Sequence, residues 1–288
     1  MPHPSPRVMS GLQAMAFSAL FFSIMTLFVK VLGAYLPNQE IVFIRNFFTL
    51  LLTGGALWKK RINPFGQHYA LLLLRGLSGF AALSCFFYAV ALLPLAVATV
   101  IQFTNPIFTA ILAAVWLKED WDSRLKLATL LGLSGVVIIA RPWQPDPSGV
   151  GSGPLILALA GAILASIAYV SIRKLATLEP PLVVIFYFPL VGTPISAVAS
   201  FSSWVWPTPW QWGFLLSVGV AAQLGQVFMT RGLFRERAGR ATVVGYLQLA
   251  FATLWGLLFF SEIPGWSSLL GSVLIIGGVL YLRTPRRQ

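Results

Sequence analysis

Apolar residues gather along this chain into long continuous runs that are separated by short polar stretches. A helix rises 1.5 Å per residue, so about 20 apolar residues are needed to cross a hydrocarbon core ~30 Å thick. Ten runs reach or approach that length, and we expect transmembrane helices over Gly11–Leu32, Ile41–Trp58, Tyr69–Leu93, Leu95–Leu117, Leu125–Ala140, Pro154–Ile172, Leu182–Phe201, Trp210–Phe234, Ala241–Phe260 and Trp266–Leu282.

These runs are apolar at successive positions and not at every second one, so they predict an all-α membrane protein and not a barrel of alternating strands. Met1–Ser10 lacks the small residues of a signal-peptide cleavage site, and the run after it is long enough to stay in the membrane as the first span.

The second half of the chain repeats the first at a constant offset of 143 residues, with no gap. The offset carries Ser23-Ile24 onto Ser166-Ile167, Lys30 onto Arg173, Pro37 onto Pro180, Ala98-Thr99-Val100 onto Ala241-Thr242-Val243 and Glu119 onto Glu262. Each half then holds five spans, and an odd number makes the second copy cross the membrane in the opposite sense. We therefore predict two inverted five-helix repeats, at residues 1–145 and 146–288, with the working site between them.

Composition agrees with a membrane protein: 57% of the residues are hydrophobic, only 10% are charged, and the mean hydropathy is +0.82. A soluble domain carries roughly a quarter charged residues. The single cysteine, Cys85, falls inside a span, so no intramolecular disulfide can form.

The net charge of +12 raises the question of nucleic acid, but its distribution predicts membrane topology instead. With the N-terminus inside, 15 of the 20 basic residues lie in the inner segments and only Arg141 lies in an outer loop. This positive-inside bias predicts a multi-pass protein of the bacterial inner membrane with both termini in the cytoplasm, and the lipid bilayer, not nucleic acid, as its partner.

Chemistry that needs an acid, a base or a metal has no obvious residues within the spans. All eight acidic residues and both histidines fall in loops or at span ends, so we expect no enzyme, no metal site, no cofactor and no proton relay. Two Gly-Leu-Ser-Gly stretches, Gly76–Gly79 and Gly132–Gly135, resemble a serine protease motif, but no intramembrane histidine could serve as their base. Close helix packing explains them better.

Four cations fall within the expected spans: Lys30, Arg45, Arg75 and Arg231. Each lies within about two turns of a span end, so snorkelling to the headgroups is the simpler expectation. Arg75 is the deepest of the four and is the one candidate for a contact with substrate.

Neutral polar residues mark the middle of the membrane. On the fourth span Thr99, Gln102, Asn105 and Thr109 share one helical face, and Asn105 is about 15 Å into the span. The offset pairs Asn105 with Gln248 and Phe103 with Tyr246. Pro106 frees a backbone carbonyl as a further ligand. Hydrogen bonding between helices for packing alone remains an alternative for these residues.

Other candidates to line a site are Gln223 and Gln226 on the eighth span, Tyr88 on the third and Trp255 on the ninth. Aromatic side chains away from the interfaces could bind a flat ring through stacking or edge contacts.

The stretch Ala96–Trp121, which contains Trp-Leu-Lys-Glu, and the stretch Arg240–Glu262, which ends in Phe-Phe-Ser-Glu, resemble the EamA-type branch of the drug/metabolite transporter superfamily. The resemblance covers nearly the whole chain and is greatest to YddG-type exporters of aromatic amino acids. It implies a basket of helices around a central cavity, with the fifth and tenth spans supporting the outside or joining a homodimer. The cavity residues that it implies are Tyr88, Gln102, Phe103, Asn105, Gln223, Gln226, Tyr246, Gln248 and Trp255.

The sequence therefore predicts an inner-membrane transporter that exports small organic metabolites, foremost amino acids with aromatic or apolar side chains, by alternating access. A broad-specificity exporter of drugs or quaternary amines is the alternative within the superfamily, although such cations usually need a buried carboxylate. A structural subunit is the alternative outside it, but it would not need a mid-membrane polar pair.

Overall fold

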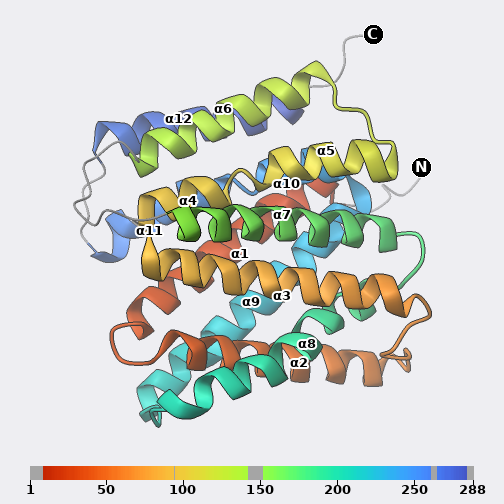
Figure 1. Cartoon of the computed structure of the whole chain (residues 1–288), viewed down its shortest axis with the longest axis vertical. Coiled ribbons are helices and arrows are strands. Elements are labelled where there is room, and N and C mark those ends of the chain that lie inside the picture. The colour runs from red at the N-terminus through yellow and green to blue at the C-terminus, as the bar shows by residue number, and fades with distance from the viewer. Residues whose placement is uncertain (1–8, 94, 142–151, 261–264, 284–288) are drawn as a thin grey trace, which may run out of the picture.

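The computed structural model describes residues 9–93, 95–141, 152–260 and 265–283, and its helices run alongside one another in one bundle (Figure 1). The α-helices of the described residues are α1 (Gly11–Leu32), α2 (Asn38–Lys59), α3 (Tyr69–Leu92), α4 (Leu95–Gln102), α5 (Asn105–Leu117), α6 (Ser123–Ala140), α7 (Ser152–Leu175), α8 (Pro181–Ser200), α9 (Pro209–Arg235), α10 (Ala238–Val244), α11 (Leu247–Phe260) and α12 (Trp266–Arg283). A short 3-10 turn, Phe201–Ser203, follows α8.

These helices confirm an all-α membrane fold. Among the described residues, nine helical segments are long and apolar enough to cross a bilayer, and the tenth, Trp266–Leu282, is shorter. The boundary that we predict at residues 145 and 146 lies outside the described residues, as does Glu262, so the structure tests neither of them.

The fourth and ninth spans are broken, which corrects the expectation of one continuous helix in each. The fourth breaks at Phe103 and Thr104, between α4 and α5. Pro106, at the start of α5, has no N–H to donate to the carbonyl of Gln102 in the preceding turn, which weakens the helix at this point. The ninth breaks at Gly245 and Tyr246, between α10 and α11, which is within one residue of the same place in the 143-residue register.

Several helices begin at polar residues that cap them. Ser10 and Gln13 form a reciprocal capping box at the start of α1, and Thr208 and Gln211 form another at the start of α9. The side chain of Asp122 accepts a hydrogen bond from the N–H of Leu125, 2.8 Å away, at the start of α6. These contacts satisfy N–H groups that a helix end otherwise leaves without partners.

Helix ends gather on two opposite faces, as alternate crossing requires. On one face, Arg235 donates to the carbonyl of Met9 and Arg240 to that of Leu282, each over 2.7 Å, so the start of α1 and the end of α12 lie together. On the other face, Arg141 donates to Ser267 over 2.7 Å. We call these the inner and outer faces, because the charge bias predicts the first to be cytoplasmic.

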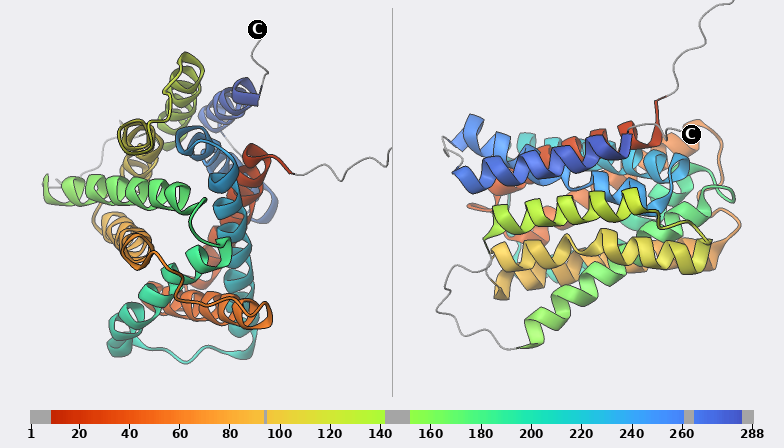
Figure 2. Two further views of the ribbon diagram at one scale, coloured as in Figure 1. Left: turned by 90° about the vertical axis from the view of Figure 1, so that its right-hand side faces the viewer. Right: turned by 90° about the horizontal axis from the view of Figure 1, so that it is seen from above.

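The packing follows the symmetry of the repeat. Helix α1 packs against α9, and their counterparts α7 and α3 pack against each other. The self-matched pairs α2–α8 and α6–α12 lie at opposite edges of the bundle (Figures 1 and 2). The hydroxyl of Ser18 donates to the carbonyl of Gly225 over 2.9 Å, and the equivalent Gly161 packs close to the carbonyl of Ala82. An inverted repeat predicts such matched contacts.

One pair of contacts departs from this symmetry. Helices α5 and α10, the inner halves of the broken spans, pack against each other, whereas among the described residues the outer halves α4 and α11 make no comparable contact. The space between the two repeats is therefore closed toward the inner face.

Candidate functional site

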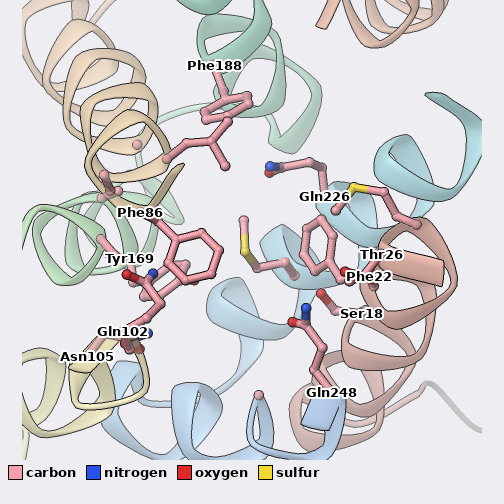
Figure 3. A pocket seen from close by; sticks show the side chains of 18 of the residues that line it. Ser18, Phe22, Thr26, Phe86, Gln102, Asn105, Tyr169, Phe188, Gln226 and Gln248 are labelled. Atoms are coloured by element: carbon pink, nitrogen blue, oxygen red, sulfur yellow. Dashed lines mark hydrogen bonds between the residues drawn. The ribbon is translucent and has the colours of Figure 1, made fainter. Parts of the chain in front are cut away.

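A cavity of about 330 Å³ lies between the two repeats and takes side chains from both (Figure 3). It reaches Val29 and Asn38 near the outer ends of α1 and α2, while Met15 and Met229 lie near its inner end. The cavity is thus directed toward the outer face and is deepest in the inner half of the membrane.

The structure brings six of the ten predicted site residues to this cavity. They come from α3, from the two parts of the fourth span, from α9 and from α11: Arg75, Gln102, Phe103, Asn105, Gln226 and Gln248. Figure 3 shows Gln102 and Asn105 on one side of the cavity and Gln248 on the other, as the repeat offset predicts.

The other four predicted residues lie elsewhere. Tyr88 is 62% exposed on the outside of α3. Gln223 turns away from the cavity to accept a hydrogen bond from Thr53, 3.1 Å away. Tyr246 is completely buried beside Phe103, with its ring centroid 5.9 Å from that of Phe103. The indole of Trp255 donates to Ser23 over 2.9 Å, and Trp255 lines a separate cavity of about 370 Å³.

Residues that share a helical face still point in somewhat different directions. Their spacing alone does not tell which of them point into the cavity. Gly132 leaves room for the ring of Tyr246, and this draws the tyrosine into the packing against α6 and away from the cavity. The side chains that hydrogen-bond Gln223 and Trp255 come from segments distant in the sequence, so the residues around Gln223 and Trp255 do not predict these contacts.

Asn105 has a structural task at the break in the fourth span. Its side-chain N–H donates to the carbonyl of Gln102 over 2.8 Å, and this is the carbonyl that Pro106 leaves without its helical donor. The hydroxyl of Ser166 on α7 donates to the backbone carbonyl of Asn105 over 2.9 Å. The carbonyl of Gln102 thus already accepts one hydrogen bond within the protein, and is not the unpartnered group that Pro106 alone would leave.

Two of the four intramembrane cations do not snorkel. Arg45 and Arg75 are only 6% and 2% exposed, and both line the cavity. Their guanidinium carbons lie 5.6 and 5.3 Å from the centre of the same ring, that of Phe188. Lys30 and Arg231 are exposed, as expected. Sequence reasoning missed Arg45, although α2 carries a signal that could have found it. Polar residues recur along one side of this helix at three- and four-residue spacing, and all of them are buried: Arg45, Asn46, Thr49 and Thr53.

A polar cluster closes the inner end. The carboxylate of Glu119, just after α5, accepts from Arg173 over 2.8 Å and from the N–H of Ala238 over 2.7 Å. Arg173 also donates to the carbonyls of Leu233 and Phe234 at the end of α9. A carboxylate at the start of α10 and a guanidinium at the end of α9 both complement the helix dipoles. This Glu119 cluster links the inner ends of the fourth, sixth, eighth and ninth spans.

Comparison with known proteins decides the family. The model of the EamA-like transporter family matches this chain twice, over residues 9–141 and 153–284. The chain belongs to the EamA-like transporter family. It is a membrane transporter and not an enzyme, and within the described residues no three His, Cys, Asp or Glu side chains are grouped as a metal site would require.

Its relatives carry different substrates. The chain is 32% identical to the pseudopaline exporter CntI of Pseudomonas aeruginosa, covering 96% of this chain and 97% of the relative. It is 30% identical to human solute carrier family 35 member G1 (92% and 76% covered) and 27% identical to an S-adenosylmethionine uptake transporter of Rickettsia bellii (88% and 86% covered). None of these three names concerns aromatic amino acids, so the closer resemblance to YddG-type exporters remains a hypothesis.

A solved crystal structure shares the fold, with a TM-score of 0.84 and 19% identity over 96% of this chain and 98% of the other.

Proposed function

We propose that this protein exports small amino-acid-like metabolites with aromatic or apolar side chains, by alternating access. The observation that carries the proposal is the 330 Å³ cavity between the two repeats, which has amides on both sides and aromatic walls. Ligands that bind at the interface of such repeats can be released to either side when the halves exchange conformations.

The cavity offers separate surroundings for the two ends of such a molecule. Gln102, Gln226 and Gln248 present neutral donors and acceptors for polar groups. Phe22 and Phe86 face into the same space from α1 and α3 (Figure 3). An aromatic substrate side chain gains ~0.5–1.5 kcal/mol from offset or edge-to-face contacts with such rings, beyond the gain from burial.

The Glu119 cluster supports the alternating-access part of the proposal. It holds the inner ends of four spans together while the cavity extends toward the outer face. This arrangement suits a state that releases substrate outward, and export requires the cluster to open in the other half of the cycle.

Export of drugs or quaternary amines is the weaker candidate. A cation buried at low dielectric needs a carboxylate or a similar partner. No acidic side chain lines the central cavity in the part of the chain that the structure describes, whereas Arg45 and Arg75 do.

Counterflow into liposomes of purified protein tests the proposal. Liposomes loaded with unlabelled phenylalanine should accumulate labelled phenylalanine, and tyrosine, tryptophan and leucine should compete better than lysine or tetramethylammonium. Exchange should persist when the pH gradient is collapsed, since no carboxylate or histidine lines the described cavity. Exchange of quaternary amines without any exchange of amino acids would contradict the proposal, and empty liposomes provide the control.

A further inference from the structure

Arg45 and Arg75 place two positive charges at one end of the cavity, against one ring. The two guanidinium groups lie within 5.6 and 5.3 Å of the centre of Phe188 and come from α2 and α3, both in the first repeat. The repeat mate of Arg45 is Phe188 itself, and that of Arg75 is Val218, so the charge has no counterpart in the second repeat. The positive charge of the cavity therefore lies on the side of the first repeat.

Neither charge is balanced within the described residues. The Nε atoms of both arginines are buried without a hydrogen-bond partner. Arg75 donates from Nη2 to the side-chain oxygen of Gln226 over 3.2 Å, a neutral acceptor, and no ion pair involves either arginine in the described part of the chain.

Such an arrangement is unfavourable in an empty cavity. Two like charges repel each other at low dielectric, and a buried charge without a counterion loses much of its hydration. The ring of Phe188 offsets only part of this, because a cation–π contact contributes about 0.5–2 kcal/mol. Ionisable groups kept inside a membrane at such cost are usually functional.

We infer that Arg45 and Arg75 form a clamp for the carboxylate of the transported molecule. The planar guanidinium group binds a carboxylate through two parallel N–H···O bonds, and both guanidinium-bearing residues line the cavity. Gln226 already holds Arg75, so the clamp is partly preorganised. The inference rests on the proposed function and names which group of the substrate this end of the cavity recognises.

The clamp orients the substrate along the cavity. With the carboxylate beside Phe188, an ammonium group and a side chain extend toward the space between Gln248 and the pair Gln102 and Asn105, which Figure 3 shows at the opposite end. A free carboxylate is then essential for binding, whereas the ammonium group, which meets only neutral amides and hydroxyls, is secondary.

Competition by three analogues of phenylalanine tests directly whether the carboxylate matters more for binding than the ammonium group. Binding of labelled phenylalanine to purified protein in detergent is measured against 3-phenylpropionate, which lacks the ammonium, and against phenethylamine and phenylalanine methyl ester, which lack the carboxylate. We expect 3-phenylpropionate to compete within about threefold of phenylalanine itself. The amine and the ester should be weaker by about ten- to 150-fold, the loss of a charged hydrogen bond.

Variants locate the effect. Arg45→Gln and Arg75→Gln should each weaken phenylalanine binding by about ten- to 150-fold, and Arg45→Lys and Arg75→Lys should fall in between, because lysine keeps the charge but not the paired donors. Arg231→Gln is the matched control, since Arg231 also lies in a span but is exposed and does not line the cavity. The thermal midpoint of the unliganded Gln variants should equal or exceed that of the wild type, because each removes an unbalanced buried charge.

The outcomes separate the clamp from the proposed function. Equal competition by phenethylamine and 3-phenylpropionate, or unchanged binding in both Gln variants, would overturn the clamp and leave amino-acid export standing. Binding of labelled 3-phenylpropionate without any binding of phenylalanine would overturn amino-acid export and leave the clamp standing. Stronger competition by inorganic phosphate than by 3-phenylpropionate would reassign the arginines to phosphate. If a Gln variant does not fold, the Lys variants and the analogues still decide.

Discussion

Asn105 and its repeat mate Gln248 both reach the cavity, but only Asn105 also supports the backbone. Replacing Gln248 with alanine should remove one hydrogen bond to substrate, which costs ~0.5–1.5 kcal/mol, or up to about tenfold in affinity, and should leave stability unchanged. Asn105→Ala should weaken binding similarly and also lower stability by about 1–3 kcal/mol, because the carbonyl of Gln102 loses its donor.

Substrate binding and thermal unfolding, measured on the same detergent samples, separate the two effects. Val115→Ala is a suitable control on the same helix as Asn105, since Val115 is 77% exposed on the outside of the bundle. If both amide variants bind and transport substrate as the wild type does, the pair serves packing alone.

Glu179 gives a residue-scale prediction on pH. Its carboxylate, on the inner face between α7 and α8, accepts from the N–H groups of Gln67 and His68 and from the ring of His68. Burial opposes ionisation, but these hydrogen bonds and the nearby imidazole outweigh it and hold the pKa of the Glu179 carboxyl below its ordinary value. A lowered folded-state pKa means that this stabilisation is present at neutral pH and is lost as pH falls through that pKa.

Glu179→Gln should therefore be less stable than the wild type at pH 7 by about 1 kcal/mol, and the gap should close as the pH falls through the lowered pKa of the Glu179 carboxyl. Thermal unfolding across this pH range provides the measurement. A gap of constant size at all pH values would show that shape, and not charge, is what Glu179 contributes.

Among the elements, span positions were predictable, but only one of the two helix interruptions had a local signal in the sequence. A long apolar run fixes the two ends of a span to within a few residues, and α1 has the predicted bounds, Gly11–Leu32. The break before Pro106 had a visible signal, because a proline inside a span removes a helical donor. The equivalent break at Gly245 and Tyr246 contains no proline, and only the offset of 143 residues, applied to the first break, could have indicated it.

The Glu119 cluster leads to a prediction about the inner closure. In Glu119→Gln the amide NH2 must face either Arg173 or the N–H of Ala238, so one of the two short contacts becomes a clash between donors. We expect the inner ends of α5 and α10 to separate more often. A cysteine at Met229, deep in the cavity, should then react at least severalfold faster with an impermeant maleimide applied to the inner face.

The measurement uses inside-out vesicles and a Cys85→Ala background. Asp120→Asn is the matched control, because the carboxylate of Asp120 is next in the chain and pairs with Arg237, but its side chain is 73% exposed. Equal labelling rates in the Glu119 and Asp120 variants would mean that the cluster does not hold the inner face closed.

For the whole molecule, the repeat predicted more than the composition did. The matched contacts of α1 with α9 and of α3 with α7 follow from it, as does the meeting of Asn105 and Gln248 across one cavity. What it could not predict is where symmetry fails. The buried arginines lie only in the first repeat, and which side of α2 and α3 faces inward depends on packing with helices distant in sequence. Four of the ten predicted site residues were misplaced for the same reason.

Topology is the prediction that tests the whole arrangement. The bias of 15 basic residues to one on the outer side predicts that the face bearing Lys59–Arg61 and Arg235–Arg240 is cytoplasmic. Single cysteines in a Cys85→Ala background can be placed at three exposed sites: Asn38 and Trp206 on the outer face and Gln67 on the inner face. In intact cells the first two should react with an impermeant maleimide, and Gln67→Cys should react only after the membrane is opened. Asn38 and Gln67 belong to the first repeat and Trp206 to the second, so labelling of Asn38→Cys and Trp206→Cys from opposite sides would exclude the inverted arrangement.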